Sequence, residues 1–243
     1  MRQRLRMAQL LLHVDALRHE VGVLEARRSL RQQQLLRRRH TGEGSLAGIA
    51  NDYYVLFQRG FCTCLVHGAG RGMCNAHSAC VSNAQRQRQF ISTIMMDDVV
   101  TGDLVGRDAA LFQWQVISSA FDGFQLRVDR VSVCGSEDAP LVQLHATLRV
   151  RVSRRTLLLL FPGAERNPRL VERFVNFEGS FAMVTSLRFD ANSRISFEHV
   201  NISIVQGFQA AGFSLPNIVE LMQHCVLTPT ATVHRDRVPQ VID

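Results

Sequence analysis

The sequence predicts an α+β protein in which an N-terminal helix precedes one folded domain. Three observations predict this class. A coiled-coil-like apolar repeat occupies residues 7–24, helical periodicity recurs up to residue 121, and apolar and polar residues alternate from residue 124 onward. With 243 residues and 46% hydrophobic content, the chain is long enough to bury one sizeable core. We therefore expect a zipper-like helix over residues 1–38, a linker over 39–48, the domain over 49–230 and a tail over 231–243.

The N-terminal helix is predicted from apolar residues spaced alternately three and four apart, which form the seam of a heptad repeat. The seam consists of Met7, Leu10, Val14, Leu17, Val21 and Leu24. β-Branched residues at one seam position and leucines at the other favour a parallel two-stranded coil. A surface helix of the domain would show the same pattern. Glu20 and Glu25 would face each other across a parallel homodimer, which favours a heteromeric partner or a helix that docks on its own domain.

The formal charge of +7 is confined to the start of the chain. Residues 1–40 hold ten arginines and three acids, whereas the remainder holds 18 of each. Such a distribution is typical of a nucleic-acid-binding arm on a neutral domain, and equally of a solvated basic helix. The six cysteines follow no secretory start, which favours a reducing compartment, and no apolar run approaches the length of a membrane span. We expect no membrane association.

Four helices are predicted within the domain and its surroundings. Apolar periodicity places them over residues 49–59, around residues 90–95, over 110–121 with Asp108 as the cap, and over 214–225. Ser214 and Pro216 suit the first turn of the last helix.

The strands are predicted from alternation with a period of two. It is clearest over residues 142–152, whose other face is polar, and it also covers 124–128 and 181–189. The turn-forming residues 190–193 lead into a partner strand over 195–204, which predicts an antiparallel hairpin.

A loop predicted over residues 61–83 concentrates soft metal ligands: Cys62, Cys64, His67, Cys74, His77 and Cys80. Any four of them could close a tetrahedral zinc site. Their spacing matches no zinc template, however, so we expect thiols without metal and assign no metal ligand. Acids at positions 97, 98, 103 and 108 could indicate a metal loop, but helix-end and cap roles explain them more simply.

Several motifs recur together along the chain. They are the arginine-rich start with its seam, Tyr53-x-x-x-Phe57-x-x-Gly60, Phe90, Gly102-x-x-x-Gly106, Gln113-Trp114, Thr156 and Phe161-Pro162. Together they resemble the C-terminal part of the oomycete bZIP transcription factors over roughly residues 1–230. The resemblance implies a zipper followed by a nuclear-transport-factor-like, or SnoaL-like, cone domain, in which a curved antiparallel sheet cups the helices. It also implies a nuclear regulator with a bZIP-type homo- or heterodimer partner.

The basic region departs from the family, because only Arg2, Arg4 and Arg6 precede the seam. A bZIP basic region needs a longer helix that reaches base edges. Three phosphate contacts predict weak, salt-sensitive DNA binding without sequence discrimination. Residues 37–40, Arg-Arg-Arg-His, are a short match to a nuclear address.

The function predicted is a bZIP-like transcription regulator with a truncated basic region, dimerising through the zipper and the cone. One alternative is a ligand-binding or dimerisation cone without DNA binding. The other is a cone-fold isomerase or dehydratase, for which Asp122, Asp129 and His145 are the available acid–base groups. Nothing in the sequence places these three together, and Tyr53 and Tyr54 come much earlier, so we expect no enzyme and no cofactor.

Overall fold

The structure is a computed structural model that describes residues 13–14, 17–18, 20–25, 27, 41, 44–62, 77–136 and 139–237. Its helices are α2 (Ser45–Leu56), α3 (His77–Ile94), α4 (Arg107–Ala120), α5 (Arg154–Leu160), α6 (Pro168–Phe174), α7 (Ile204–Ala210) and α8 (Leu215–Met222), with short 3-10 turns at Pro162–Arg166 and Arg235–Arg237. Its strands are β1 (Met95–Thr101), β2 (Leu104–Val105), β3 (Asp122–Gly135), β4 (Pro140–Arg151), β5 (Glu178–Phe189) and β6 (Ile195–Ile202). The α+β class predicted from the sequence is confirmed.

The six strands form one sheet in the order β2-β1-β6-β5-β4-β3. Neighbouring strands are antiparallel except for β1 and β6, which run parallel, so the antiparallel sheet implied by the resemblance contains one parallel pair. The predicted hairpin between residues 181 and 204 is present as β5 and β6. The carboxylate of Asp190 accepts hydrogen bonds from the backbone N–H groups of Asn192 and Arg194, which fixes the turn between them.

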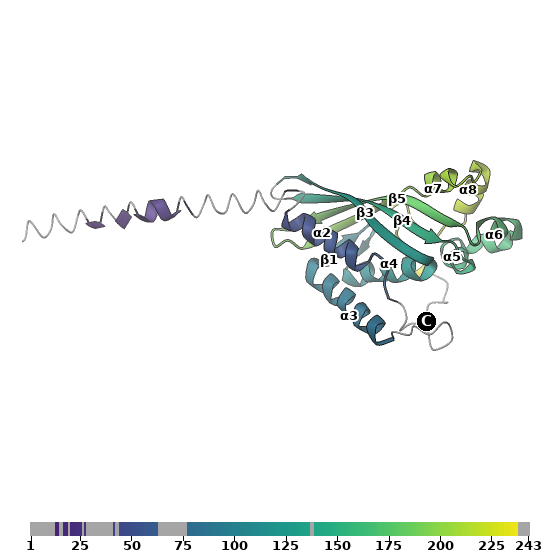
Figure 1. Ribbon diagram of the computed structural model, residues 1–243, viewed down its shortest axis with the longest axis horizontal. Coiled ribbons are helices and arrows are strands. Elements are labelled where there is room, and N and C mark those ends of the chain that lie inside the picture. Colours follow the sequence, from purple (N-terminus) through teal and green to yellow (C-terminus); the bar gives the residue numbers. More distant parts are fainter. Residues whose placement is uncertain are drawn as a thin grey trace, which may run out of the picture.

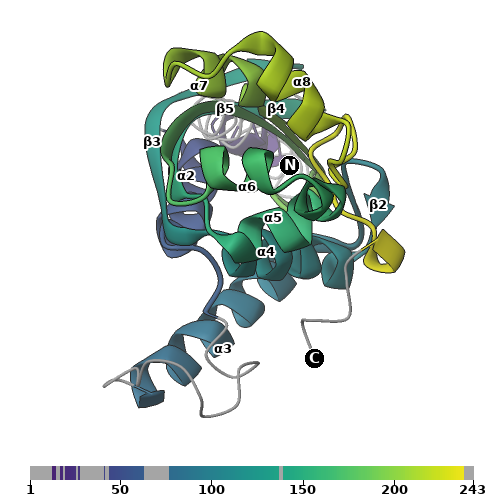
Figure 2. The same cartoon turned by 90° about the vertical axis from the view of Figure 1, so that its right-hand side faces the viewer.

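The sheet is bent into an arch, and α2 and α4 lie inside it (Figure 1, Figure 2). Strand β4 explains this arrangement, because its alternate side chains are buried and the intervening ones are more exposed. The buried set consists of Val142, Leu144, Ala146, Leu148 and Val150. These residues face the aromatic side chains of α2, so that the sheet and the helices share a single core. The cupped arrangement implied by the resemblance is confirmed.

Helix α3 holds the end of α2 in place through one buried side chain. The amide nitrogen of Gln87 donates to the carbonyl oxygens of Leu56 (3.1 Å) and Gly60 (2.9 Å), and its oxygen accepts from the backbone N–H of Cys62 at 3.2 Å. Carbonyls at a helix end have no partner within the helix. Gln87, which is fully buried, supplies that partner and fixes the chain where it leaves α2.

Several predicted boundaries differ from the structure. Helix α2 begins at Ser45, before the predicted start at residue 49, and α3 begins at His77, inside the predicted loop 61–83. Met95 starts β1 rather than ending a helix, because it pairs with Ile195 of β6. The helix-end role predicted for Asp97 and Asp98 is therefore wrong, since both lie on β1.

Two further differences concern helix ends and connections. The predicted cap at Asp108 is wrong, because Gly106 occupies the N-cap of α4 with a φ of 103° and Asp108 lies in the first turn. Helices α5 and α6 were not predicted, since each spans only two turns between β4 and β5. Helix α8 has Ser214 at its N-cap and Pro216 in its first turn, although the Ser214 side chain makes no capping bond.

Only part of the predicted zipper helix lies among the described residues. Residues 20–25 are helical, and the seam residues Val14, Leu17, Val21 and Leu24 are all exposed, with fractions from 42% to 56%. Met7, Leu10, Arg2, Arg4 and Arg6 lie outside the described residues. Among the helices described, none is long and apolar enough to cross a membrane.

Candidate functional site

A cavity lies beneath the sheet, between the strands and helix α4. It offers about 70 Å³ to the centres of water-sized molecules. A single water needs roughly 10–15 Å³ of such space, so the cavity has room for about five waters or a similarly small organic molecule. Apolar side chains make up most of its wall, including Leu126, Leu148, Met183, Val200 and Ile202 from the sheet and Ala110, Trp114 and Ile117 from α4.

One acid lies in this apolar wall. Glu198 of β6 is 3% exposed and lines the cavity. Its Oε1 accepts a hydrogen bond from the Tyr53 hydroxyl at 3.2 Å, and its Oε2 accepts a long one from the Thr101 hydroxyl at 3.5 Å. The indole N–H of Trp114 in turn donates to the Tyr53 oxygen at 2.5 Å. The carboxyl group is therefore held by α2 and β1 directly, and by α4 through Tyr53.

Burial raises the pKa of Glu198 from 4.5 to about 7, and the hydrogen bonds from Tyr53 and Thr101 only partly oppose this rise. The pKa values of Tyr53 and Tyr54 are raised well above 10, first by burial and then by the charge of Glu198. Both phenols therefore stay neutral near pH 7, while Glu198 changes its charge there. A carboxyl group in its protonated form can donate a hydrogen bond into the cavity.

The aromatic side chains around Glu198 fix its partners. The ring of Tyr53 packs edge-on against those of Tyr54 and Phe57, with centroids 5.4 and 5.3 Å apart. Trp114 of α4 contacts all three rings, and its centroid lies 4.5 Å from that of Phe57. The hydroxyl groups of Tyr54 and Thr185 share a hydrogen bond inside the core. Helix α2 therefore presents two consecutive tyrosines to the sheet, of which Tyr53 holds the acid and Tyr54 lines the cavity.

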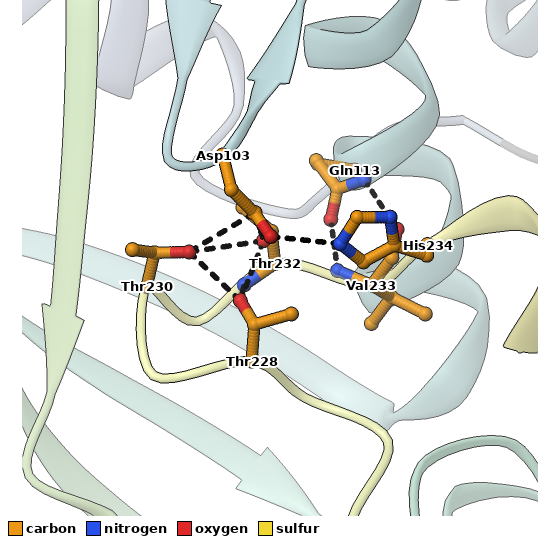
Figure 3. A network of polar contacts seen from close by, with 7 residues as sticks. All are labelled: Asp103, Gln113, Thr228, Thr230, Thr232, Val233 and His234. Carbon is orange, nitrogen blue, oxygen red and sulfur yellow. Dashed lines mark hydrogen bonds and ion pairs between the residues drawn. The ribbon is translucent and has the colours of Figure 1, made fainter.

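The segment 228–234, here called the strap, completes the cavity wall, and polar contacts join it to Asp103 and Gln113 (Figure 3). Thr230 and Thr232 donate to Oδ1 of Asp103, and Nε2 of His234 lies 2.7 Å from its Oδ2. The side chain of Gln113 pairs with the backbone of Val233 in both directions, at 2.9 and 2.8 Å. Asp103 lies between β1 and β2, and Gln113 lies on α4, so the strap joins the two sides of the cavity. The predicted tail 231–243 thus contains residues that pack on the domain.

The acid–base candidates proposed from the sequence lie elsewhere. Asp122 and Asp129 are exposed on β3, and neither they nor His145 line the cavity. Asp129 accepts a hydrogen bond from Thr147 at 2.6 Å, and His145 lies 3.2 Å from the Arg130 guanidinium, all on the outer face of the sheet. The alternation of β4 explains this placement, because His145 and Thr147 fall between the inward residues.

Glu198 was missed from the sequence, although a signal for it exists. In β6 it shares the face of Val200 and Ile202, which also line the cavity. An acid on the apolar face of a strand is unusual and marks a polar group buried in the core.

The predicted metal loop is only partly described. Cys64, His67 and Cys74 lie outside the described residues, as do the side chains of His77 and Cys80. Within the part of the chain that the structure describes, no group of three or more His, Cys, Asp or Glu side chains could hold a metal ion.

Comparison with protein families identifies part of the domain. Residues 47–120 match the family model of the bZIP transcription factor 1 C-terminal domain. Over these residues, the match agrees with the resemblance inferred from the sequence. The matched stretch runs from α2 to the end of α4 and contains Tyr53, Gln113 and Trp114, which hold Glu198 and the strap. No curated protein matches the chain.

Solved structures give only distant likenesses. TsrD from Streptomyces laurentii is 10% identical, with a TM-score of 0.37, over 52% of this chain and 82% of that one. An NTF2-like protein from Exiguobacterium is 10% identical, with a TM-score of 0.38, over 64% and 98% of the two chains. A SnoaL-like polyketide cyclase from Agrobacterium tumefaciens is 9% identical, with a TM-score of 0.37, over 52% and 86%. At these identities and TM-scores, the likenesses say nothing about activity.

Proposed function

We propose that the chain is a bZIP-type transcription regulator whose cone domain binds a small, largely apolar molecule in the cavity around Glu198. The family match supports the first half of this proposal. The single observation that carries the second half is an acid with a pKa of about 7 in the wall of an apolar cavity. A buried carboxyl group in its protonated, neutral form can donate one hydrogen bond to a ligand oxygen.

The zipper and the basic arm belong to the same proposal. Val14, Leu17, Val21 and Leu24 expose an apolar row that a second helix would cover, and Glu20 and Glu25 favour a partner with basic residues opposite them. Arg2, Arg4 and Arg6 would then contact DNA phosphates without reading bases, and residues 37–40 would direct the protein to the nucleus.

The size of the cavity defines a probe for the binding proposal. 2-Butanone has an apolar body and one carbonyl acceptor, and at about five heavy atoms it should bind with a Kd of about 1 mM or weaker. Binding is measured from the NMR shifts of the Met183 methyl group and the Trp114 indole, both of which belong to cavity-lining residues.

The matched variants are Ala110→Leu, which fills the cavity from α4, and Ala182→Leu, which adds the same volume at an exposed position of β5. We expect saturable shifts in the wild type and in Ala182→Leu, and none in Ala110→Leu. Equal shifts in both variants, or no saturable shift in the wild type, would contradict binding in the cavity.

A second candidate function is acid–base chemistry at the same carboxyl group, because a pKa near neutral suits proton transfer. The bound ketone tests it directly. Exchange of the α-hydrogens of 2-butanone in D₂O that is accelerated by the wild type, and not by Glu198→Gln, would identify chemistry. Binding without such exchange supports a ligand-sensing role.

A further inference from the structure

The strap lies between the cavity and solvent without belonging to the sheet or to a helix. Thr230, Ala231 and Thr232 line the cavity, and the first two are themselves partly exposed. Glu198, on β6, is almost fully buried. Displacement of this one segment would therefore open the cavity and leave the strands and helices that hold Glu198 in place.

Two side chains hold the strap at this position. Oδ1 of Asp103 accepts hydrogen bonds from the hydroxyls of Thr230 and Thr232. Its Oδ2 lies next to the imidazole of His234. These hydrogen bonds, with that from Thr232 the strongest, lower the pKa of Asp103 to about 2, so the acceptor is ionised at neutral pH. Gln113 supplies both bonds to the backbone of Val233, which is fully buried. Asp103 and Gln113 together are called the latch.

The strap is preformed as one piece. The backbone N–H of Thr228 donates to the carbonyl of Thr232 at 2.8 Å, and Ala231 closes this turn with a φ of 57°. The hydroxyl of Thr228 lies 2.7 Å from those of Thr230 and Thr232 and donates to one of them at a time, since these two donate their own protons to Asp103. These internal bonds do not depend on the latch, so the strap can leave the latch without unravelling.

We propose that the strap is a gate over the ligand cavity and that the latch controls how often the gate opens. The role of the gate rests on the proposed binding function, because a gate serves a cavity that binds a ligand. The opening itself rests only on the position of the strap between the cavity and solvent. A molecule in the cavity would contact Thr230, Thr232 and Gln113, which line it and also form the closed gate. A ligand in the cavity and a closed strap therefore stabilise each other. Ligand binding would thus change how often the strap, at the C-terminal end of the domain, is open.

The single tryptophan of the chain provides the measurement, because Trp114 lines the cavity next to Gln113. Quenching of its fluorescence by acrylamide, a small neutral amide, reports access to the cavity. Asp103→Asn keeps the size of the side chain and removes the charged acceptor. Loss of a charge-assisted hydrogen bond should raise the open population about tenfold and the acrylamide quenching constant about twofold or more.

Asp129→Asn is the matched control. Asp129 also accepts a threonine hydroxyl on an exposed carboxylate, but it does so on the outer face of the sheet. The acrylamide quenching constant of Asp129→Asn should equal that of the wild type. Thr232→Val removes a strap hydroxyl that donates to the latch, without a change of size, and should raise quenching even if Asp103→Asn fails to fold. Asp103→Asn and Thr232→Val are called the latch variants. The Val233 amide, which donates to Gln113, should exchange with solvent faster in both latch variants.

Quenching and amide exchange in folded Thr232→Val equal to those of the wild type would overturn the gate. The acrylamide measurement needs no ligand, which separates this inference from the proposed function. If 2-butanone binds but the latch variants quench like the wild type, the gate is wrong and the binding proposal stands. If the latch variants open the cavity and 2-butanone fails to bind, the gate stands and the binding proposal is wrong.

Discussion

Glu198→Gln should remove a pH dependence of stability that the wild type carries. The folded pKa of Glu198 is raised from 4.5 to about 7 by burial, so folding favours the protonated form. The contribution to stability is therefore fully present below pH 4.5 and is lost as the pH rises through about 7. Since one pKa unit corresponds to 1.36 kcal/mol, the loss amounts to about 3 kcal/mol between about pH 4 and about pH 8.

The assay is urea unfolding followed by far-UV circular dichroism across this pH range, on the wild type and on Glu198→Gln. The amide of the variant stays neutral, so the difference in unfolding free energy isolates the titration of Glu198 from all other groups. Glu178→Gln is the control, because its side chain is 70% exposed and pairs with Arg151 on the surface. If the wild type and Glu198→Gln differ by the same amount at every pH, the buried-acid description is wrong.

Three further outcomes are expected. Gln87→Leu should lower the free energy of unfolding by about 3 kcal/mol in urea titrations, because it removes three hydrogen bonds to the backbone. A loss below about 1 kcal/mol would refute that role. Gly102→Ala should destabilise the fold more than Gly212→Ala, because both have a positive φ but only the Cβ at residue 102 meets the strap, 2.6 Å from a methyl carbon. Equal melting temperatures of the two would count against that contact. Leu17→Glu places a charge on the predicted seam and should abolish any dimer seen by analytical ultracentrifugation. Val23→Glu places the same charge off the seam and should leave that dimer intact. Equal effects of the two changes would argue against pairing through the seam.

The fold class was predictable because its evidence is local. The alternation in β4 and β5 marks which side chains face the core, and the turn-forming residues after β5 mark its hairpin with β6. β1 was mistaken for a helix end because its sequence, Met-Met-Asp-Asp-Val-Val-Thr, does not alternate cleanly and its partner β6 lies about a hundred residues away. The parallel pairing of these two strands leaves no signal in either segment alone.

The candidate site was less predictable, because its residues are brought together only by the tertiary structure. Tyr53 and Glu198 are 145 positions apart, and Gln113 and Val233 are 120 apart. The sequence singled out Tyr53, Gln113 and Trp114 through the family resemblance, without showing what they contact. From the sequence, Asp122 and Asp129 were the acid–base candidates. Their carboxyl groups suit proton transfer, but both are exposed on β3 and neither lines the cavity.

The structure also connects the cavity with helix α2. Helix α2, the first helix of the domain, supplies Tyr53 to Glu198, while the sheet supplies Thr101 from the opposite side. A ligand that accepts a hydrogen bond from Glu198 would favour its protonated form, which accepts the hydrogen bond from Tyr53 more weakly than the carboxylate does, and would so alter a contact of α2.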